Sequence, residues 1–385
     1  MQILKLIYKN AFRHKLRTFL TIAGISIAIL SFGLLRTVIS AWYVGVEASA
    51  ANRLVTRNSI SIIFPLPLSY QEKIRQIDGV KTVSYGNWFG GVYIDEKNFF
   101  ANFAVEPESY LELYPEYVLP PAQKAAFLRD RKAFFAGRKL AERYKWKLGD
   151  TIILKGTIFP GDWDFVLRAI YKGRDKNIDE SQFIFHWDYL NESIKKTAPR
   201  RADQVGFYMV GVKNPIYAAE VSNAIDRTFK NSLAETITET EKAFQLGFIS
   251  MSEAIVIAIQ MVSFVVIIII MAVVANTMAM TARERFGEYA VLKTLGFGGP
   301  YIIGLIFGES LLITSIGCIL GIALTFPAAH AFGSLMSQFF PVFNVSVKTI
   351  YLEIVSSFIV GITAAIIPSY RAVNIRIADG LRRIG

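Results

Sequence analysis

The sequence predicts an α-helical membrane protein with four transmembrane helices and a large α+β extracytoplasmic domain between the first and the second of them. Three observations support this fold class. Four long stretches of the chain are almost wholly apolar, and the residues between the first two stretches show mixed, strand-like and helix-like patterns. Charged residues make up only 19% of the chain, whereas soluble domains contain about a quarter.

The apolar stretches are long enough to cross a bilayer, because a spanning helix needs about 20 mostly apolar residues. The second stretch has no charged residue between Ala254 and Met280, and the third has one acid, Glu309. No other stretch has this character. We therefore predict transmembrane helices at residues 18–41, 251–280, 300–326 and 350–369.

Lysines and arginines orient these helices, since basic residues concentrate on the cytoplasmic side of a membrane protein. The loop between the third and fourth helices offers only Lys348, whereas the other flanks carry Lys5, Lys9, Arg13, Lys15, Arg17, Arg283, Arg285, Lys293, Arg371, Arg376, Arg382 and Arg383. We expect a multi-pass protein of the inner (cytoplasmic) membrane with both termini in the cytoplasm. The other segments are then a basic amphipathic interfacial helix (1–17), a periplasmic domain (42–250), a cytoplasmic helix and turn (281–299), an outer loop (327–349) and a cytoplasmic tail (370–385).

The net charge of +11 is accounted for mainly by these flanking residues and the lipid headgroups they face, so we expect no nucleic-acid partner. The small residues Ala48–Ala50 resemble a signal-peptide cleavage site. Arg36 and Glu47 lie between them and the apolar core, which favours an uncleaved first helix.

The predicted outer domain alternates strands and helices, which favours an α+β domain over a sandwich. Its helices are bounded by ordinary stop and start signals, such as Gly79 and the Asn214–Pro215 pair. The elements we expect are a strand at 59–67, a helix, turn and strand over 68–85, a helix and strand over 134–154, a period-two strand over 164–173, and a helix over 214–232.

Motifs for catalysis and for nucleotide or metal binding are missing. The sequence has no G-x-x-x-x-G-K-[ST], H-E-x-x-H or G-x-S-x-G pattern, and Cys318 is its single cysteine. Its three histidines are far apart, and acids such as Asp162 and Asp179 are scattered over predicted loops. We therefore expect no catalytic, metal or cofactor site on this chain, and a membrane-anchored enzyme is the least favoured class.

Glu309 is the one acid that we single out inside a predicted span. An ionisable group at that depth normally faces protein or water, so we favour a role in packing within a moving helix bundle over direct contact with cargo. The same helix contains two G-x-x-x-G pairs, Gly304 with Gly308 and Gly317 with Gly321. Such pairs permit close helix approach.

Residues 281–299 form a polar segment between two apolar ones. Apolar and charged positions alternate as in a helix, Gly296 is suited to a left-handed helix stop, and Pro300 fits the first turn of the next helix. The segment therefore predicts a helix of about fifteen residues at the inner membrane surface, which offers its side chains to something in the cytoplasm. The alternative is an ordinary loop.

Several motifs resemble those of the FtsX/MacB-like permease family of ABC transporters, also called the mechanotransmission or type VII group. The resemblance spans nearly the whole chain, and its most specific parts are the segment between the second and third spans and the C-terminal motif. The closing motif departs from the family pattern, with Ile377 and Ala378 near the usual proline. The matching segments are 12–28, 135–154, "RERFGEYAVLKTLGF" (283–297), 308–326 and "PSYRAVNIRIADGLR" (368–382).

The resemblance implies a permease that works as a dimer, homodimeric or with a homologous permease, above a separate ABC ATPase that binds ATP and Mg²⁺. This chain would have no enzymatic activity of its own. The helix from Arg283 to Gly296 would dock into the ATPase and transmit its motion to the periplasmic domain. The residues implied in this coupling are Arg283, Glu284, Arg285, Gly287, Glu288, Lys293 and Gly296.

The favoured function is export or efflux, with a periplasmic adaptor and an outer-membrane channel as further partners. Two alternatives within the family stay open, a permease that releases lipoproteins and a mechanical signalling transducer without cargo. The cargo itself is not readable from these residues.

Overall fold

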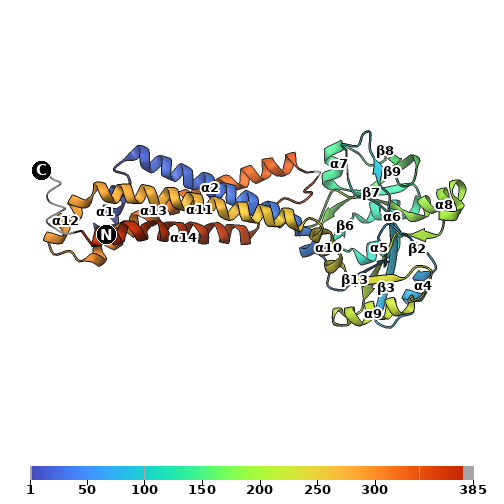
Figure 1. The fold of residues 1–385 in the computed structure, drawn as a ribbon. Coiled ribbons are helices and arrows are strands. Elements are labelled where there is room, and N and C mark those ends of the chain that lie inside the picture. Colours follow the sequence, from blue (N-terminus) through green and yellow to red (C-terminus); the bar gives the residue numbers. More distant parts are fainter. Residues whose placement is uncertain (1, 99, 338, 376–385) are drawn as a thin grey trace. The chain divides into compact units, whose positions relative to one another are not determined.

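The computed structural model describes residues 2–98, 100–337 and 339–375 (Figure 1). The chain divides into two compact units. We call the first the helical unit; it comprises Met1–Ala41, Glu253–Leu335 and Phe343–Gly385. We call the second the sheet unit; it comprises Trp42–Ser252 and Met336–Val342.

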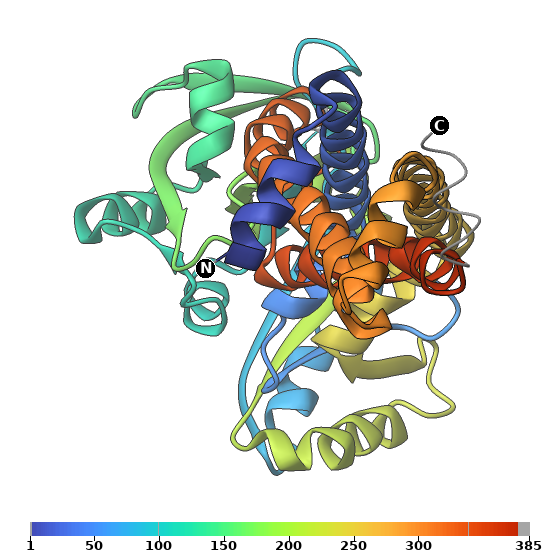
Figure 2. The same cartoon turned by 90° about the vertical axis from the view of Figure 1, so that its left-hand side faces the viewer.

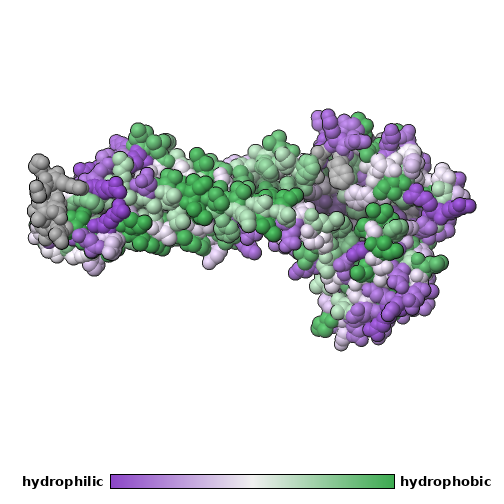
Figure 3. All heavy atoms as spheres, in the orientation of Figure 1, coloured by the Kyte–Doolittle hydropathy of each residue, from purple (hydrophilic) through white to green (hydrophobic). Residues whose placement is uncertain are grey.

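Among the described residues, four helices are long and apolar enough to cross a membrane, which confirms the predicted fold class. Figure 3 shows apolar residues along the middle of the helical unit and hydrophilic ones near the end that carries α1 and α12. The six helices of the unit are α1 (Gln2–Ala11), α2 (Lys15–Trp42), α11 (Glu253–Glu284), α12 (Phe286–Thr294), α13 (Gly299–Leu335) and α14 (Val347–Val373).

Several of the predicted boundaries differ from the structure. Helix α13 continues to Leu335 and α14 begins at Val347, so both helices extend into the predicted outer loop (327–349). The basic amphipathic helix ends at Ala11, and residues 15–17 already belong to the long helix α2. The polar segment after the second span is not one helix of fifteen residues, because α11 continues to Glu284 and the chain breaks at Arg285, with φ −105° and ψ 12°. Only the nine residues of α12 follow before the turn.

The helix α13 packs against α1, α2, α11 and α14, and Figure 2 shows it (orange) among them, seen from the end of the bundle that carries the N-terminus. Small residues bring α2 close. A Cβ atom added at Gly317 would lie 2.6 Å from Ile25 Cγ2, and one at Gly321 would lie 2.7 Å from Ile29 Cβ. Ser26 Oγ also donates a hydrogen bond to the Gly317 carbonyl oxygen over 3.1 Å.

Hydroxyl groups join α13 to α14 in the same manner. Ser310 Oγ donates to the Gly361 carbonyl oxygen at 2.7 Å, and Ser357 Oγ donates to the Thr314 carbonyl oxygen at 3.1 Å. Small and hydroxylated residues at helix contacts are typical of membrane bundles, where hydrophobic burial gives no preference for protein over lipid.

The sheet unit is built on a large mixed sheet with the strand order β13-β1-β12-β3-β5-β10-β7-β9-β8-β4, while β6 pairs with β9 beside this path. The pairs β10–β5 and β7–β9 are parallel, and the other pairs are antiparallel. A separate pair joins β2 and β11. The strands are β1 (Arg53–Asn58), β2 (Leu66–Pro67), β3 (Val80–Trp88), β4 (Gly91–Val92), β5 (Asn102–Val105), β6 (Tyr117–Val118), β7 (Ala133–Gly137), β8 (Thr151–Gly156), β9 (Gly161–Gly173), β10 (Phe183–His186), β11 (Gln204–Val205), β12 (Phe207–Val212) and β13 (Thr236–Thr240).

Short helices cover the sheet and enclose two clusters of buried side chains. The long strand β9 alternates buried and half-buried residues along most of its length, as its period-two pattern predicts. The helices of this unit are α3 (Val44–Ala48), α4 (Tyr70–Arg75), α5 (Pro107–Leu113), α6 (Pro121–Arg129), α7 (Arg138–Tyr144), α8 (Trp187–Thr197), α9 (Ala218–Thr228) and α10 (Glu241–Ser250), with 3-10 turns η1 (Pro199–Arg201) and η2 (Pro215–Tyr217).

The predicted strand at residues 59–67 is wrong except for its last two residues, which form β2. The Asn58 side chain accepts a hydrogen bond from the Ile60 backbone N–H, and Ser61 Oγ accepts one from Ile63 N–H. Such local bonds offer the backbone an alternative to a ladder. The apolar side chains of this loop are therefore left exposed, Ile63 by 86%.

Candidate functional site

A buried arginine lies at the break between α11 and α12. Arg285 is 7% exposed. Its Nη1 donates to Glu309 Oε2 on α13 at 2.9 Å, and its Nε donates to Glu288 Oε2 on α12 at 2.9 Å. The break points the guanidinium inward, where it neutralises a carboxylate that is 3% exposed. A charge at such a depth is tolerated when it is paired.

Two further ion pairs join this region to the chain around the start of α2. Arg13 contacts Glu288, and Arg17 makes a bidentate pair with Glu284 at 2.7 and 2.8 Å. Burial would raise the pKa of the Glu288 carboxyl, but the hydrogen bonds from Arg13 and Arg285 outweigh this effect and hold the pKa below its ordinary value. Glu288 on α12 is thus a charged link to the turn at Arg13 and to the helix break at Arg285.

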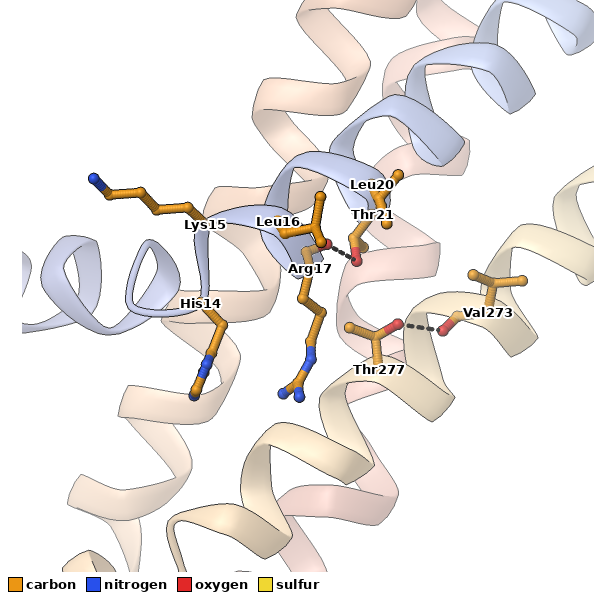
Figure 4. A pocket seen from close by; sticks show the side chains of 8 residues that line it. All are labelled: His14, Lys15, Leu16, Arg17, Leu20, Thr21, Val273 and Thr277. Carbon is orange, nitrogen blue, oxygen red and sulfur yellow. Dashed lines mark hydrogen bonds between the residues drawn. The ribbon is translucent and has the colours of Figure 1, made fainter.

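Beside these pairs, the first turns of α2 and the facing part of α11 line an open cavity of about 640 Å³. Figure 4 shows Arg17 extending from α2 along this cavity, while Thr21 and Thr277 bond back to their own helices. The lining residues are His14, Lys15, Leu16, Arg17, Leu20, Thr21, Val273 and Thr277.

At its other end α12 is fastened to α14. Lys293 Nζ donates hydrogen bonds to the carbonyl oxygens of Val373 and Ile375, the latter at 2.9 Å. A lysine at these positions satisfies carbonyl groups that a helix end leaves without intrahelical partners. Gly296, with φ +91°, then ends α12 in the left-handed conformation that its sequence position predicts.

Four of the predicted coupling residues bond to other parts of the helical unit. Glu284, Arg285, Glu288 and Lys293 bond to α2, α13, the Arg13 turn and the end of α14; Arg285 is buried, Glu288 and Lys293 are half-buried, and Glu284 is exposed. Arg283 is exposed, and Gly287 is half-buried. A charged residue next to an apolar span had suggested an outward side chain, but here the charges hold the helices to one another.

Three of the exposed residues on α12 and its turn are apolar, which the sequence analysis did not single out. Val291 is 40% exposed, Leu295 69% and Phe297 40%. An open cavity of about 670 Å³ lies next to Val291 and Arg283. Its lining residues are Leu6, Asn10, Arg283, Glu284, Arg285, Phe286, Gly287, Glu288, Val291, Leu292 and Leu305.

The glycine pairs of α13 differ in what they contact. A Cβ at Gly308 would lie 2.5 Å from Ile7 Cδ1 of α1, and Gly317 and Gly321 face α2. Gly304 has nothing within 4 Å of an added Cβ. No neighbour within the described part of this chain packs at Gly304, so its role in helix packing stays a prediction.

A second buried acid, Glu353 on α14, escaped the sequence analysis. It is wholly buried; its Oε1 accepts from Thr325 Oγ1 at 3.2 Å, and it lies against Gly33 of α2. Its Oε2 has no hydrogen-bond partner among the described residues, and neither has Nε of Arg36. The sequence did offer a signal for this residue, because Glu353 is the only acid in the fourth apolar stretch.

Comparisons with known proteins agree on one family. The family model for the FtsX-like permease C-terminal domain matches residues 260–377. An uncharacterised ABC transporter permease of Methanocaldococcus jannaschii is 26% identical over 410 residues, which cover 99% of this chain and 97% of that protein. The macrolide export ATP-binding/permease protein MacB of Campylobacter jejuni is 23% identical over 220 residues, 57% of this chain and 34% of MacB.

Two solved structures align with part of the chain at low overall similarity. The periplasmic region of MacB from Actinobacillus actinomycetemcomitans aligns with a TM-score of 0.39 and 9% identity over 53% of this chain and 95% of its own. The extracellular domain of the transporter YknZ aligns with a TM-score of 0.35 and 11% identity over 49% of this chain and 100% of its own.

Proposed function

Since residues 260–377 form an FtsX-like permease domain and the chain is homologous to ABC transporter permeases, MacB among them, we propose that it couples ATP hydrolysis by a separate ATPase to motion of its sheet unit, in the service of export. ATP and Mg²⁺ bind to the ATPase subunit. This chain receives the motion and passes it on.

The observation that carries the proposal is the set of polar links that leave α12 and the adjoining end of α11. They reach the Arg13 turn, α2 through Arg17, α13 through Glu309, and α14 through Lys293. A force applied to α12 therefore acts on every long helix of the unit at once. Rigid contacts of this kind are the physical means by which a displacement is transmitted.

The surface offered to the ATPase is the apolar face of α12 and its turn, with Arg283 beside it. Val291, Leu295 and Phe297 form this face, and we name it the docking face. Apolar residues at the centre and a charge at the rim are the usual composition of a protein interface. The interior ion pairs then keep the docking face in a fixed orientation.

Replacing Val291 with aspartate is expected to weaken binding of the ATPase at least about tenfold, because it would place an unpaired charge in the interface. The measurement is co-purification with the ATPase of a neighbouring gene, together with the rate of ATP hydrolysis. Val347→Asp is the matched control, since Val347 is an 83% exposed valine at the first turn of α14. Equal co-purification of both variants with the ATPase would contradict the docking face.

The proposed topology places both termini, α1 and α12 in the cytoplasm and the sheet unit in the periplasm of an inner-membrane protein. The basic residues Lys9, Arg13, Arg283 and Lys293 lie near the end of the bundle formed by α1 and α12, as the positive-inside rule requires.

Labelling from outside the cell tests this topology. Ala51 and Thr294 are both exposed, and the buried Cys318 is first replaced by serine. An impermeant maleimide is expected to modify an Ala51→Cys variant in intact cells and a Thr294→Cys variant only after lysis. The reverse pattern would show that the sheet unit faces the cytoplasm.

The proposed assembly is a dimer of this chain, or of this chain with a homologous permease, above an ATPase dimer. An adaptor and an outer-membrane channel complete it when the cargo leaves through the outer membrane. Chemical cross-linking of the purified membrane complex followed by mass measurement tests the stoichiometry. A monomeric permease bound to a full ATPase dimer would contradict it.

A further inference from the structure

The sheet unit contains an open groove of about 900 Å³ within its own residues. Its floor is one face of four neighbouring strands, β1, β12, β3 and β5, which present Val55, Met209, Trp88 and Val105. Val55, Met209 and Val105 are at most 5% exposed. The volume is in the range of small-molecule sites, commonly about 300–1,000 Å³.

Aromatic side chains form the walls of this groove. Tyr110 and Tyr114 come from α5 and its end, Tyr117 comes from β6, and Phe244 and Phe248 come from α10. The three tyrosines form one cluster with ring-centroid distances of 4.5, 5.7 and 6.2 Å, and Tyr114 stacks on both Tyr110 and Tyr117. Each ring is therefore in contact with the other two.

The rim of the groove is apolar and open to solvent. Ile63 is 86% exposed, Ile158 42% and Phe248 49%. An exposed apolar rim over an apolar floor is unusual for a soluble surface and marks a binding site. The rim includes the loop after β1, whose backbone is held by its own side-chain hydrogen bonds.

Two tyrosine hydroxyls of the lining are already engaged by their neighbours. Tyr114 Oη donates to Glu241 Oε1 at 3.2 Å, and Tyr117 Oη donates to Gln182 Oε1 at 3.1 Å. Burial raises the pKa of both tyrosines above the ordinary value, so their hydroxyls stay neutral. A peptide in this groove would bury backbone groups without enough partners, which is costly. A hydrocarbon chain has no such groups.

The lining contains one arginine, Arg201, which suits an anionic group. The lining carboxylate Glu241 is paired with Arg53, whose Nε lies 2.8 Å from its Oε2, and Arg53 also pairs with Glu116 at 2.7 Å. Arg201 lies over the Phe159 ring at 5.1 Å and makes long contacts with the Ile158 carbonyl oxygen. No carboxylate of the described residues is paired with Arg201, so its guanidinium is left to bind an anionic group.

We propose that this groove binds a single-chain acidic amphiphile, with the chemistry of a long-chain fatty acid, whose hydrocarbon chain lies on the β1–β12–β3–β5 face and whose carboxylate contacts Arg201. The site does not depend on coupling to an ATPase. It would let the sheet unit hold an apolar molecule outside the bilayer.

The test uses the full chain in nanodiscs of phosphatidylcholine and a diazirine analogue of palmitic acid. Photo-labelling is expected on peptides that contain Phe103, Phe207 or Met209, and unlabelled palmitate should displace it. Labelling confined to the long helices of the helical unit, or not displaced by palmitate, would overturn the proposal.

Two pairs of variants sharpen the test. Arg201→Gln is expected to weaken palmitate competition about tenfold, the size of a charge-assisted contact, whereas Arg200→Gln, also exposed but outside the lining, should not. Gln245→Trp should fill the groove and abolish labelling, whereas Lys242→Trp on the same helix should not. Equal competition by palmityl alcohol, or equal effects within either pair, would overturn the assigned site.

Discussion

Replacing Glu309 with leucine is expected to lower the free energy of unfolding of the helical unit by about 3–5 kcal/mol, the cost of breaking a buried ion pair from one side. Arg285 would keep its charge at 7% exposure with only Glu288 to balance it. Glu309→Gln should cost less, because the amide oxygen still accepts a hydrogen bond from the guanidinium.

The double variant Arg285→Met with Glu309→Leu is the control for this prediction. Apolar residues of similar size commonly replace a buried pair at little cost, so the double variant should be markedly more stable than Glu309→Leu alone. The measurement is the helical circular dichroism signal during unfolding in mixed micelles. All five tryptophans lie between residues 42 and 187, so their fluorescence should report an unchanged sheet unit. A double variant as unstable as Glu309→Leu would show that loss of the Arg285–Glu309 pair does not cause the loss of stability.

Replacing Gly317 with leucine is expected to have the second largest effect, about 1–3 kcal/mol from overpacking. An added Cβ would lie 2.6 Å from Ile25 Cγ2, and the Ser26 hydroxyl bonds to the Gly317 carbonyl at the same contact. The helix α2 must therefore move away from α13. Since α2 also carries Arg17, the link to Glu284 should weaken as well.

Gly304→Leu is the matched control, since it makes the same change on the same helix at a site with nothing within 4 Å. We expect it to leave unfolding unchanged in the assay used for Glu309. If the two glycine variants lost the same stability, an effect of leucine that is independent of the α2 contact would explain both, and the close approach of α2 to α13 would not be important for stability.

The sequence was sufficient for the spans because bilayer thickness and apolar length decide them almost alone. It was also sufficient for β9, α9 and the turn at Gly296, where a local period or a single glycine carries the signal. These features depend on neighbours within a few residues. They are visible without any knowledge of the packing.

The pairing partners of the charged residues could not be predicted from such local patterns. Glu284 and Arg285 are adjacent in sequence, yet one pairs with Arg17 and the other with Glu309. Their partners are decided by the helix break at Arg285, a tertiary feature. Gly304 and Gly317 each begin a G-x-x-x-G pair. Gly317 lies against α2, whereas no neighbour within the described chain packs at Gly304. Residues 59–65 have strand composition, but side-chain bonds from Asn58 and Ser61 hold them as a loop.

The proposed docking face could not be recognised from the sequence for a similar reason. The sequence analysis expected charged residues such as Glu288 and Lys293 to be offered to a partner. In the structure both side chains bond to other parts of the helical unit. The apolar residues exposed there are Val291, Leu295 and Phe297. In a membrane protein, apolar residues next to a span are easily assigned to lipid, so the sequence alone does not separate a docking face from a lipid-facing one.

The central claim is that α12 receives work from a separate ATPase and that this work moves the sheet unit. The most direct measurement is the distance between spin labels at Asn223→Cys on α9 and Thr294→Cys on α12, in the Cys318→Ser background, by double electron–electron resonance. In the reconstituted complex with its ATPase, the account predicts that ATP shifts the distance distribution, and that Val291→Asp or omission of the ATPase abolishes the shift. A shift that ATP causes without the ATPase, or no shift in the assembled complex, would contradict it.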